Sequence, residues 1–111
     1  MTILEVFEKV NLAIPLEQRR FFNYFNDTVN ELNTLYDGFV LEDGDEYTPV
    51  RSLSDSIQVL PLYHNSIVDN ILFLAGHNDG FKGEFIRKSR LAYLKYWKSD
   101  AKGKREKRMR W

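Results

Sequence analysis

The sequence contains no cysteine and no long apolar run, and its 111 residues carry a formal net charge of zero. The lack of cysteine excludes disulfide bonds, thiolate nucleophiles and cysteine-based zinc or iron–sulfur sites. No stretch approaches the about 18 consecutive apolar residues that indicate a membrane-spanning helix, so we expect no membrane span. The first ten residues carry Glu5 and Glu8 and lack the basic start of a signal peptide, so we expect a cytoplasmic protein.

The sequence motifs of several enzyme and metal-site classes are also missing. The chain has no GxSxG, GxxxxGK[ST], GxGxxG or HExxH pattern, which would indicate a hydrolase, a phosphate-binding loop or a zinc site. Its two histidines, His64 and His77, are thirteen residues apart at opposite ends of one expected helix. The acidic turn at residues 42–46 lacks the distant glutamate of an EF-hand. We therefore expect no catalytic residue, no cofactor and no metal, and a protein that is not an enzyme.

Apolar residues at helical spacing, by contrast, are abundant, because 43% of the chain is hydrophobic and 14% is aromatic. They recur every three or four residues in four segments, which predicts four helices. The predicted helices span residues 3–13, 16–36, 62–76 and 79–101. Thr2 is the expected N-cap of the first helix. Pro15 should end that helix, because a residue that precedes proline avoids the helical region.

The third and fourth predicted helices differ in how much of their surface is apolar. Residues 62–76 are apolar around most of the helix, so this helix should be the most buried, with Asp69 and Asn70 on its narrow polar side. In the fourth helix one apolar stripe should face the core, while Lys82 and the other basic residues occupy the remainder. The stripe consists of Phe81, Phe85, Ser89, Ala92 and Tyr96, and it is widened by Ile86, Tyr93, Leu94 and Trp97.

Residues 37–61 interrupt the helical period between the second and third helices. Short β-capable runs flank the acidic turn in this segment, so we expect an irregular loop in which a short β-hairpin is an open alternative. The predicted fold class is therefore all-α, a small bundle of four helices with a long irregular loop. Residues 1–101 should form a single helical domain, and residues 102–111 a basic C-terminal tail that is flexible until it is bound.

The zero net charge conceals an asymmetry between the two halves of the chain. Residues 1–60 carry eleven acidic and four basic side chains, whereas residues 61–111 carry five acidic and twelve basic ones. Three interpretations stay open: a solvated basic tail, head-to-tail contact between neighbouring copies, and phosphate binding by the tail. The terminal Met109 and Trp111 suit docking on a partner better than a solvated tail.

The fourth predicted helix also supports an alternative function. Its basic residues alternate with aromatic ones, as in Arg90, Tyr93 and Lys95, and such a pattern can neutralise phosphates and stack bases. The breaker-rich turn at residues 76–80 could also join two helices of a helix-turn-helix. The alternative is therefore a small nucleic-acid-binding regulatory protein that uses the fourth helix and the C-terminal tail.

Three segments resemble the small head–tail connector proteins of tailed phages, which are also called adaptor or head-completion proteins. The segments are RFFNYFNDTVNELNTLY at 20–36, LPLYHNSIVDNILFLA at 60–75 and FIRKSRLAYLKYW at 85–97. They are similar, in order, to the early helix with an aromatic-Asn-Asp element, the Leu-Pro, Tyr-His, Ile-Val helix, and the closing helix with a basic end. The acidic turn and residues 102–111 lie outside the resemblance.

The resemblance implies a non-catalytic structural protein of a phage or prophage virion. Such a head–tail connector subunit assembles into a homo-oligomeric ring at the portal, through which DNA passes. Its implied partners are further copies of itself and the phage portal and tail-completion proteins, with transient DNA contact and no membrane. Its implied location is the cytoplasm of the bacterial host and then the virion. The docking role would fall on Lys104, Arg105, Lys107, Arg108, Met109, Arg110 and Trp111.

Overall fold

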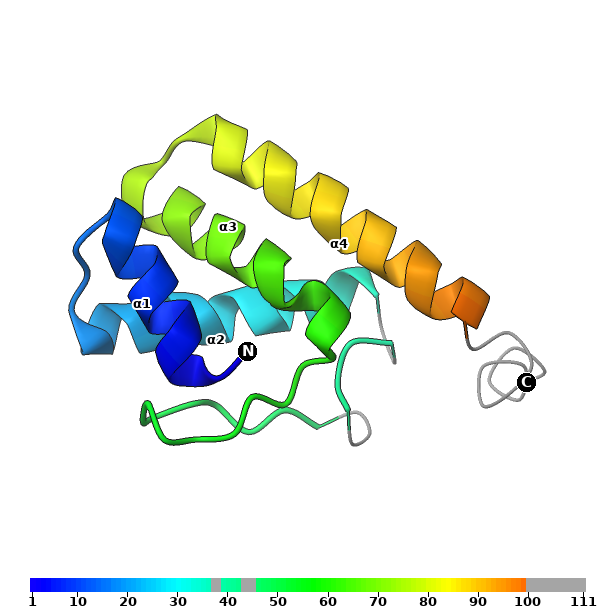
Figure 1. Cartoon of the computed structure of the whole chain (residues 1–111), viewed down its shortest axis with the longest axis horizontal. Coiled ribbons are helices and arrows are strands. Elements are labelled where there is room, and N and C mark those ends of the chain that lie inside the picture. The colour runs from blue at the N-terminus through cyan, green and yellow to red at the C-terminus, as the bar shows by residue number, and fades with distance from the viewer. Residues whose placement is uncertain (37–38, 43–45, 100–111) are drawn as a thin grey trace.

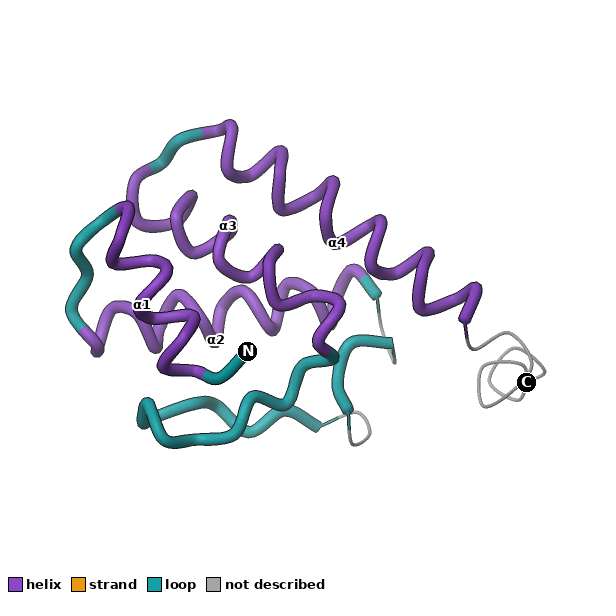
Figure 2. Tube along the Cα trace, viewed as in Figure 1, coloured by secondary structure: helices purple, strands orange, loops and turns teal. Residues whose placement is uncertain are grey.

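The computed structural model describes residues 1–36, 39–42 and 46–99, which form four α-helices and one short 3-10 helix (Figure 1). In chain order they are α1 (Ile3–Ala13), α2 (Gln18–Leu35), η1 (Pro61–Tyr63), α3 (His64–Gly76) and α4 (Asp79–Ser99). The described residues contain no strand (Figure 2). The prediction of an all-α domain with four helices is therefore confirmed.

Helix α3 lies at the centre of the fold and packs against α1, α2 and α4 (Figure 1). Ile67 and Ile71 of α3 are fully buried in the same core cluster as Phe25 of α2 and Phe85 of α4. Helices α1 and α4 flank α3, so each keeps one face on the outside of the molecule. The prediction that the third helix is the most buried one is confirmed.

The ends of α1 follow from local chemistry. Thr2 accepts a hydrogen bond from the Glu5 backbone N–H, and the Glu5 carboxylate accepts one from the Thr2 N–H. This capping box satisfies two backbone donors that would otherwise have no partner. At the other end, Asn11 donates to the Phe7 carbonyl at 2.9 Å and accepts from the Leu16 N–H at 2.9 Å. The asparagine therefore links the end of α1 to the connection into α2.

Asp69 and Asn70 lie on the polar side of α3, as predicted. They are only 8% and 0% exposed, because that side faces polar groups of α2 and α4 rather than water. The predicted widening of the core stripe by Ile86 and Leu94 is wrong, since these side chains are 41% and 46% exposed, because α4 packs against the rest of the domain along one side only. Lys82 also departs from the expected pattern, since it turns inward into the polar side of α3.

The segment between α2 and α3 forms one isolated antiparallel bridge, between Leu41 and Val59, within its described residues. This bridge joins the two ends of the segment, so the predicted short hairpin is not confirmed, and the turn at residues 43–45 lies outside the described part. Val40, Val50 and Val59 are buried in the core. These apolar anchors hold an otherwise irregular stretch of chain against the helices.

Two side-chain amides add further hydrogen bonds to this segment. Asn26 of α2 donates to the Val50 carbonyl at 3.1 Å and accepts from the Val50 N–H at 2.8 Å. Gln58 pairs with Thr48 in the same way, through its amide group and the Thr48 backbone. Tyr47 donates a further hydrogen bond to Asn26, and burial raises the pKa of its phenol well above the usual value. The segment is thus held both by side chains and by the single bridge, beside which Glu42 donates to the Gln58 carbonyl and Leu60 to the Val40 carbonyl.

Candidate interaction surfaces

A groove runs between α4 and the start of α3, and we call it the α4 groove. It is lined chiefly by Pro61, Leu62, Lys88, Leu91, Ala92 and Lys95, and its volume is about 520 Å³. Leu62 and Leu91 are 43% and 52% exposed, so they offer apolar surface to a partner. The sequence pattern did not indicate this groove, because Leu91 lies outside the predicted core stripe of its helix.

The two lysines of the α4 groove have different surroundings. The Lys88 ammonium lies 2.7 Å from the carboxylate of Asp69, which belongs to α3 and is largely buried. Lys95 is exposed, and no other residue in the described ranges forms an ion pair with it. The α4 groove therefore presents one uncommitted positive charge beside two exposed leucines. This combination suits an apolar partner segment that carries a carboxylate.

The outer face of α1 has the opposite charge, and we call Leu4, Glu8 and Leu12 on this face the α1 ridge. Leu4 is 45% exposed and Leu12 is 88% exposed. Glu8 is exposed and has no ion pair within the described part of the chain. The neighbouring Glu5 stays ionised, because hydrogen bonds from Thr2 hold the pKa of its carboxyl below the usual value. The α1 ridge therefore carries one unpaired carboxylate, that of Glu8, between two exposed leucines, with Glu5 and Lys9 beside it.

The outer surface of α4 adds further basic and apolar groups. Arg87 donates to the Glu84 carboxylate at 2.6 Å, which lowers the pKa of Glu84 and raises that of Arg87. Arg90 is exposed one turn further along, and Ile86 and Leu94 are the exposed apolar residues nearby. Because Glu84 offsets only one of the two arginines, the surface keeps a positive charge.

Two tyrosine rings of α4 contact other rings within the molecule. Tyr93 stacks on Tyr36 with ring centroids 5.0 Å apart, and Phe39 meets Tyr93 edge-on at 5.7 Å. Tyr96 contacts the other side of this cluster through Phe39 at 6.3 Å. Tyr93 and Tyr96 therefore interact with other protein rings, so these two rings do not stand free beside the exposed cations of the helix. Helices α3 and α4 also run antiparallel (Figure 1), unlike the steeply crossed pair of a helix-turn-helix.

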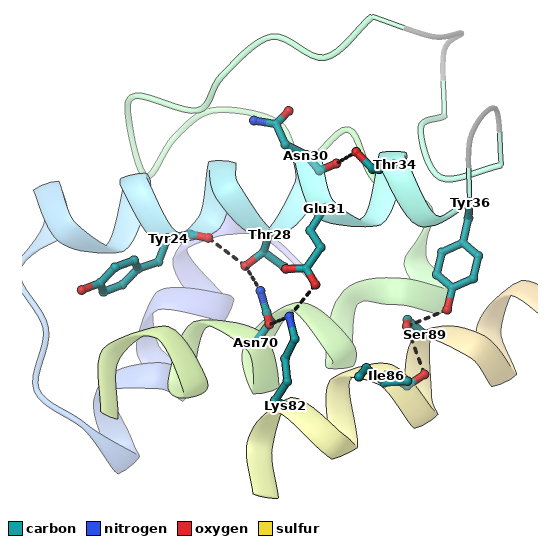
Figure 3. A network of polar contacts seen from close by, with 10 residues as sticks. All are labelled: Tyr24, Thr28, Asn30, Glu31, Thr34, Tyr36, Asn70, Lys82, Ile86 and Ser89. Carbon is teal, nitrogen blue, oxygen red and sulfur yellow. Dashed lines mark hydrogen bonds and ion pairs between the residues drawn. The ribbon is translucent and has the colours of Figure 1, made fainter. Parts of the chain in front are cut away.

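A polar network holds α4 in place against α2 and α3 (Figure 3). Thr28 donates to the Tyr24 carbonyl at 2.8 Å and accepts from Asn70 at 2.9 Å. Lys82 donates to the Asn70 side-chain carbonyl at 3.2 Å and also pairs with Glu31. Because the network joins three helices, it fixes the position of α4 and hence of the α4 groove.

The two histidines lie apart and serve the fold at separate places. His64 is 3% exposed, and its ring nitrogens contact the Val59 carbonyl at 2.7 Å and the Met1 amino group at 3.0 Å. Burial lowers the pKa of the His64 imidazole. His77 follows α3 in the left-handed conformation, with φ of 55°. Within the described residues, no three His, Asp or Glu side chains come together as metal ligands would.

The docking residues implied by the resemblance, Lys104 to Trp111, lie outside the described residues. Among the helices that the structure describes, none has the length and apolar character needed to cross a membrane. The chain matches no protein-family model, and no curated protein or solved structure is significantly similar to it. The candidate site therefore depends on the surfaces themselves, which are the α1 ridge and the α4 groove.

Proposed function

We propose that this chain is a non-catalytic structural subunit that assembles head to tail with copies of itself. The observation that carries the proposal is the pair of unlike surfaces on either side of α3. The α1 ridge is acidic and exposes Leu4 and Leu12, and the α4 groove is basic and exposes Leu62 and Leu91. Unlike surfaces on one subunit favour a heterologous contact, which closes into a ring when the rotation between subunits allows it.

In the virion of a tailed phage or prophage, this subunit serves as the head–tail connector. Three segments of the chain resemble such proteins, and they coincide with successive elements of the fold. Residues 20–36 cover most of α2, residues 60–75 cover η1 and all of α3 except Gly76, and residues 85–97 lie in α4. In this role the subunits form a ring at the portal, and the basic C-terminal residues dock on the portal or on a tail-completion protein.

Native mass spectrometry tests the proposal, first with the chain alone and then with the portal protein of the same genome. We expect a concentration-dependent series of oligomers up to a protein concentration of about 1 mM, at which a contact of about 4 kcal/mol is half-formed. Raising the salt concentration should weaken the association, because the surfaces carry opposite charge. A chain that stays monomeric at every concentration and ignores the portal would contradict the proposal.

The exposed cations of α4 support one alternative, a small nucleic-acid-binding regulatory protein. Arg90 and Lys95 are both exposed, so they are available to phosphates, although Tyr93 is already stacked on Tyr36. Such binding should fall steeply as the salt concentration rises, with little dependence on base sequence. A salt titration with duplex DNA measures this, and an absence of binding at low salt would remove the alternative.

A further inference from the structure

We infer that the α1 ridge of one copy occupies the α4 groove of the next copy. This inference rests on the proposed self-assembly and specifies the contact that produces it. The two surfaces have complementary charge, since Glu8 and Lys95 both lack an ion pair within the described part of the chain. Each surface also exposes two leucines, which a free monomer leaves in water.

The two surfaces match in length. Leu4 and Leu12 are eight residues apart on α1, which corresponds to about 12 Å along the helix. Lys88 and Lys95 are seven residues apart on α4, which corresponds to about 10 Å. Residues at this spacing lie on one face of a helix, so the ridge and the groove are each about two helical turns long.

The surroundings of the lysines decide how the ridge is placed in the groove. Lys88 already pairs with Asp69 at 2.7 Å, so Lys95 is the lysine available to the Glu8 of the incoming α1. With Glu8 beside Lys95, Leu12 lies over Leu62 and Leu91 and buries its side chain, which is 88% exposed in the single subunit. The apolar contact supplies most of the affinity, and the Glu8–Lys95 pair sets the register.

The contact is heterologous, because the ridge and the groove are different surfaces of the subunit. Each copy that donates a ridge keeps its own groove free for another copy. Repeated association therefore gives a ring or a filament according to the rotation between neighbours.

Cysteine cross-linking tests this contact directly, because the chain has no cysteine of its own. We expect a Leu12→Cys variant mixed with a Leu91→Cys variant to form a covalent dimer under mild oxidation. Leu12→Cys mixed with Leu35→Cys is the matched control, since Leu35 and Leu91 are both 52% exposed. Equal cross-linking in the two mixtures, or none in either, would overturn the inference.

Exchanging the charges of Glu8 and Lys95 provides a second test that needs no cysteine. Glu8→Lys and Lys95→Glu should each weaken self-association, and a mixture of the two variants should restore it between unlike copies. Leu12→Ala should weaken self-association by about tenfold or more, through the loss of buried apolar surface. Circular dichroism spectra identical to that of the unsubstituted chain would show that the variants fold.

The oligomeric mass of the unsubstituted chain distinguishes a wrong contact surface from a failure of self-assembly. If the unsubstituted chain forms oligomers and none of these substitutions changes their mass, the proposed self-assembly is supported. The α1 ridge and the α4 groove are then the wrong surfaces. If it is monomeric at every concentration, the proposed self-assembly fails and the inferred contact fails with it.

Discussion

Replacing Lys82 with methionine should destabilise the domain by about 2–4 kcal/mol, although the side chain sits at the edge of the core. Lys82 donates to the side-chain carbonyl of Asn70, which is fully buried. Methionine leaves that carbonyl without a donor, which costs about 1–3 kcal/mol. The lysine ammonium also lies 4.8 Å from the Phe85 ring centroid, a contact worth about 0.5–1 kcal/mol. The partly exposed pair with Glu31 adds less than about 1 kcal/mol after solvent screening.

Urea unfolding followed by far-ultraviolet circular dichroism measures this loss, at a protein concentration low enough to keep the chain monomeric. Lys9→Met is the matched control, because Lys9 is an exposed lysine on α1 without a hydrogen bond or ion pair in the described residues. Its substitution should change the free energy of unfolding by less than about 0.5 kcal/mol.

A double-mutant cycle isolates the contribution of the buried carbonyl. In an Asn70→Leu background no carbonyl is left without its donor, so Lys82→Met should cost clearly less there. A cost below about 0.5 kcal/mol in the unsubstituted background, or an equal cost in both backgrounds, would refute the reasoning.

Three further predictions concern single positions. His77→Gly should raise the free energy of unfolding by about 0.5–1 kcal/mol in urea titrations, because glycine accepts the left-handed conformation without a steric penalty. Asn26→Ala should lower it by about 2–3 kcal/mol in the same assay, because both hydrogen bonds to Val50 are lost. His64 should titrate by NMR below the ordinary histidine pKa of about 6.5. Stability should therefore fall as the pH drops below that value, since the unfolded chain takes up the proton first, and His64→Gln should reduce this pH dependence.

The helices were predictable because their signals are local. Apolar spacing, the Thr2 cap and the residue before Pro15 each act within a few positions of the chain, and α1 has the predicted bounds of residues 3–13. The start of α2 was less predictable, since the helix begins at Gln18 rather than at residue 16. That boundary depends on the Leu16 backbone, which donates to the side chain of Asn11 instead of entering the helix.

The candidate site was not predictable from the pattern of any single segment. Leu91 and Lys95 lie on the α4 side that also approaches Leu62, and only the packing of α4 against η1 and α3 brings these residues together. The exposure of Leu12 is also a tertiary result, because α1 packs against α3, buries Val6 and Val10, and leaves the opposite side uncovered.

By itself, the sequence determined the helix content, the absence of cysteine chemistry and the charge difference between the two halves. The tertiary structure alone decided which polar residues are buried and which leucines remain exposed. Asp69 and Asn70 show the physical reason. A polar side chain can be buried when another helix supplies its partner, and here that partner comes from Lys88 or Lys82 on α4. Hydrophobic periodicity indicates whether a side chain prefers the core or water. The packing of the helices determines whether a buried polar side chain has a hydrogen-bond or ion-pair partner.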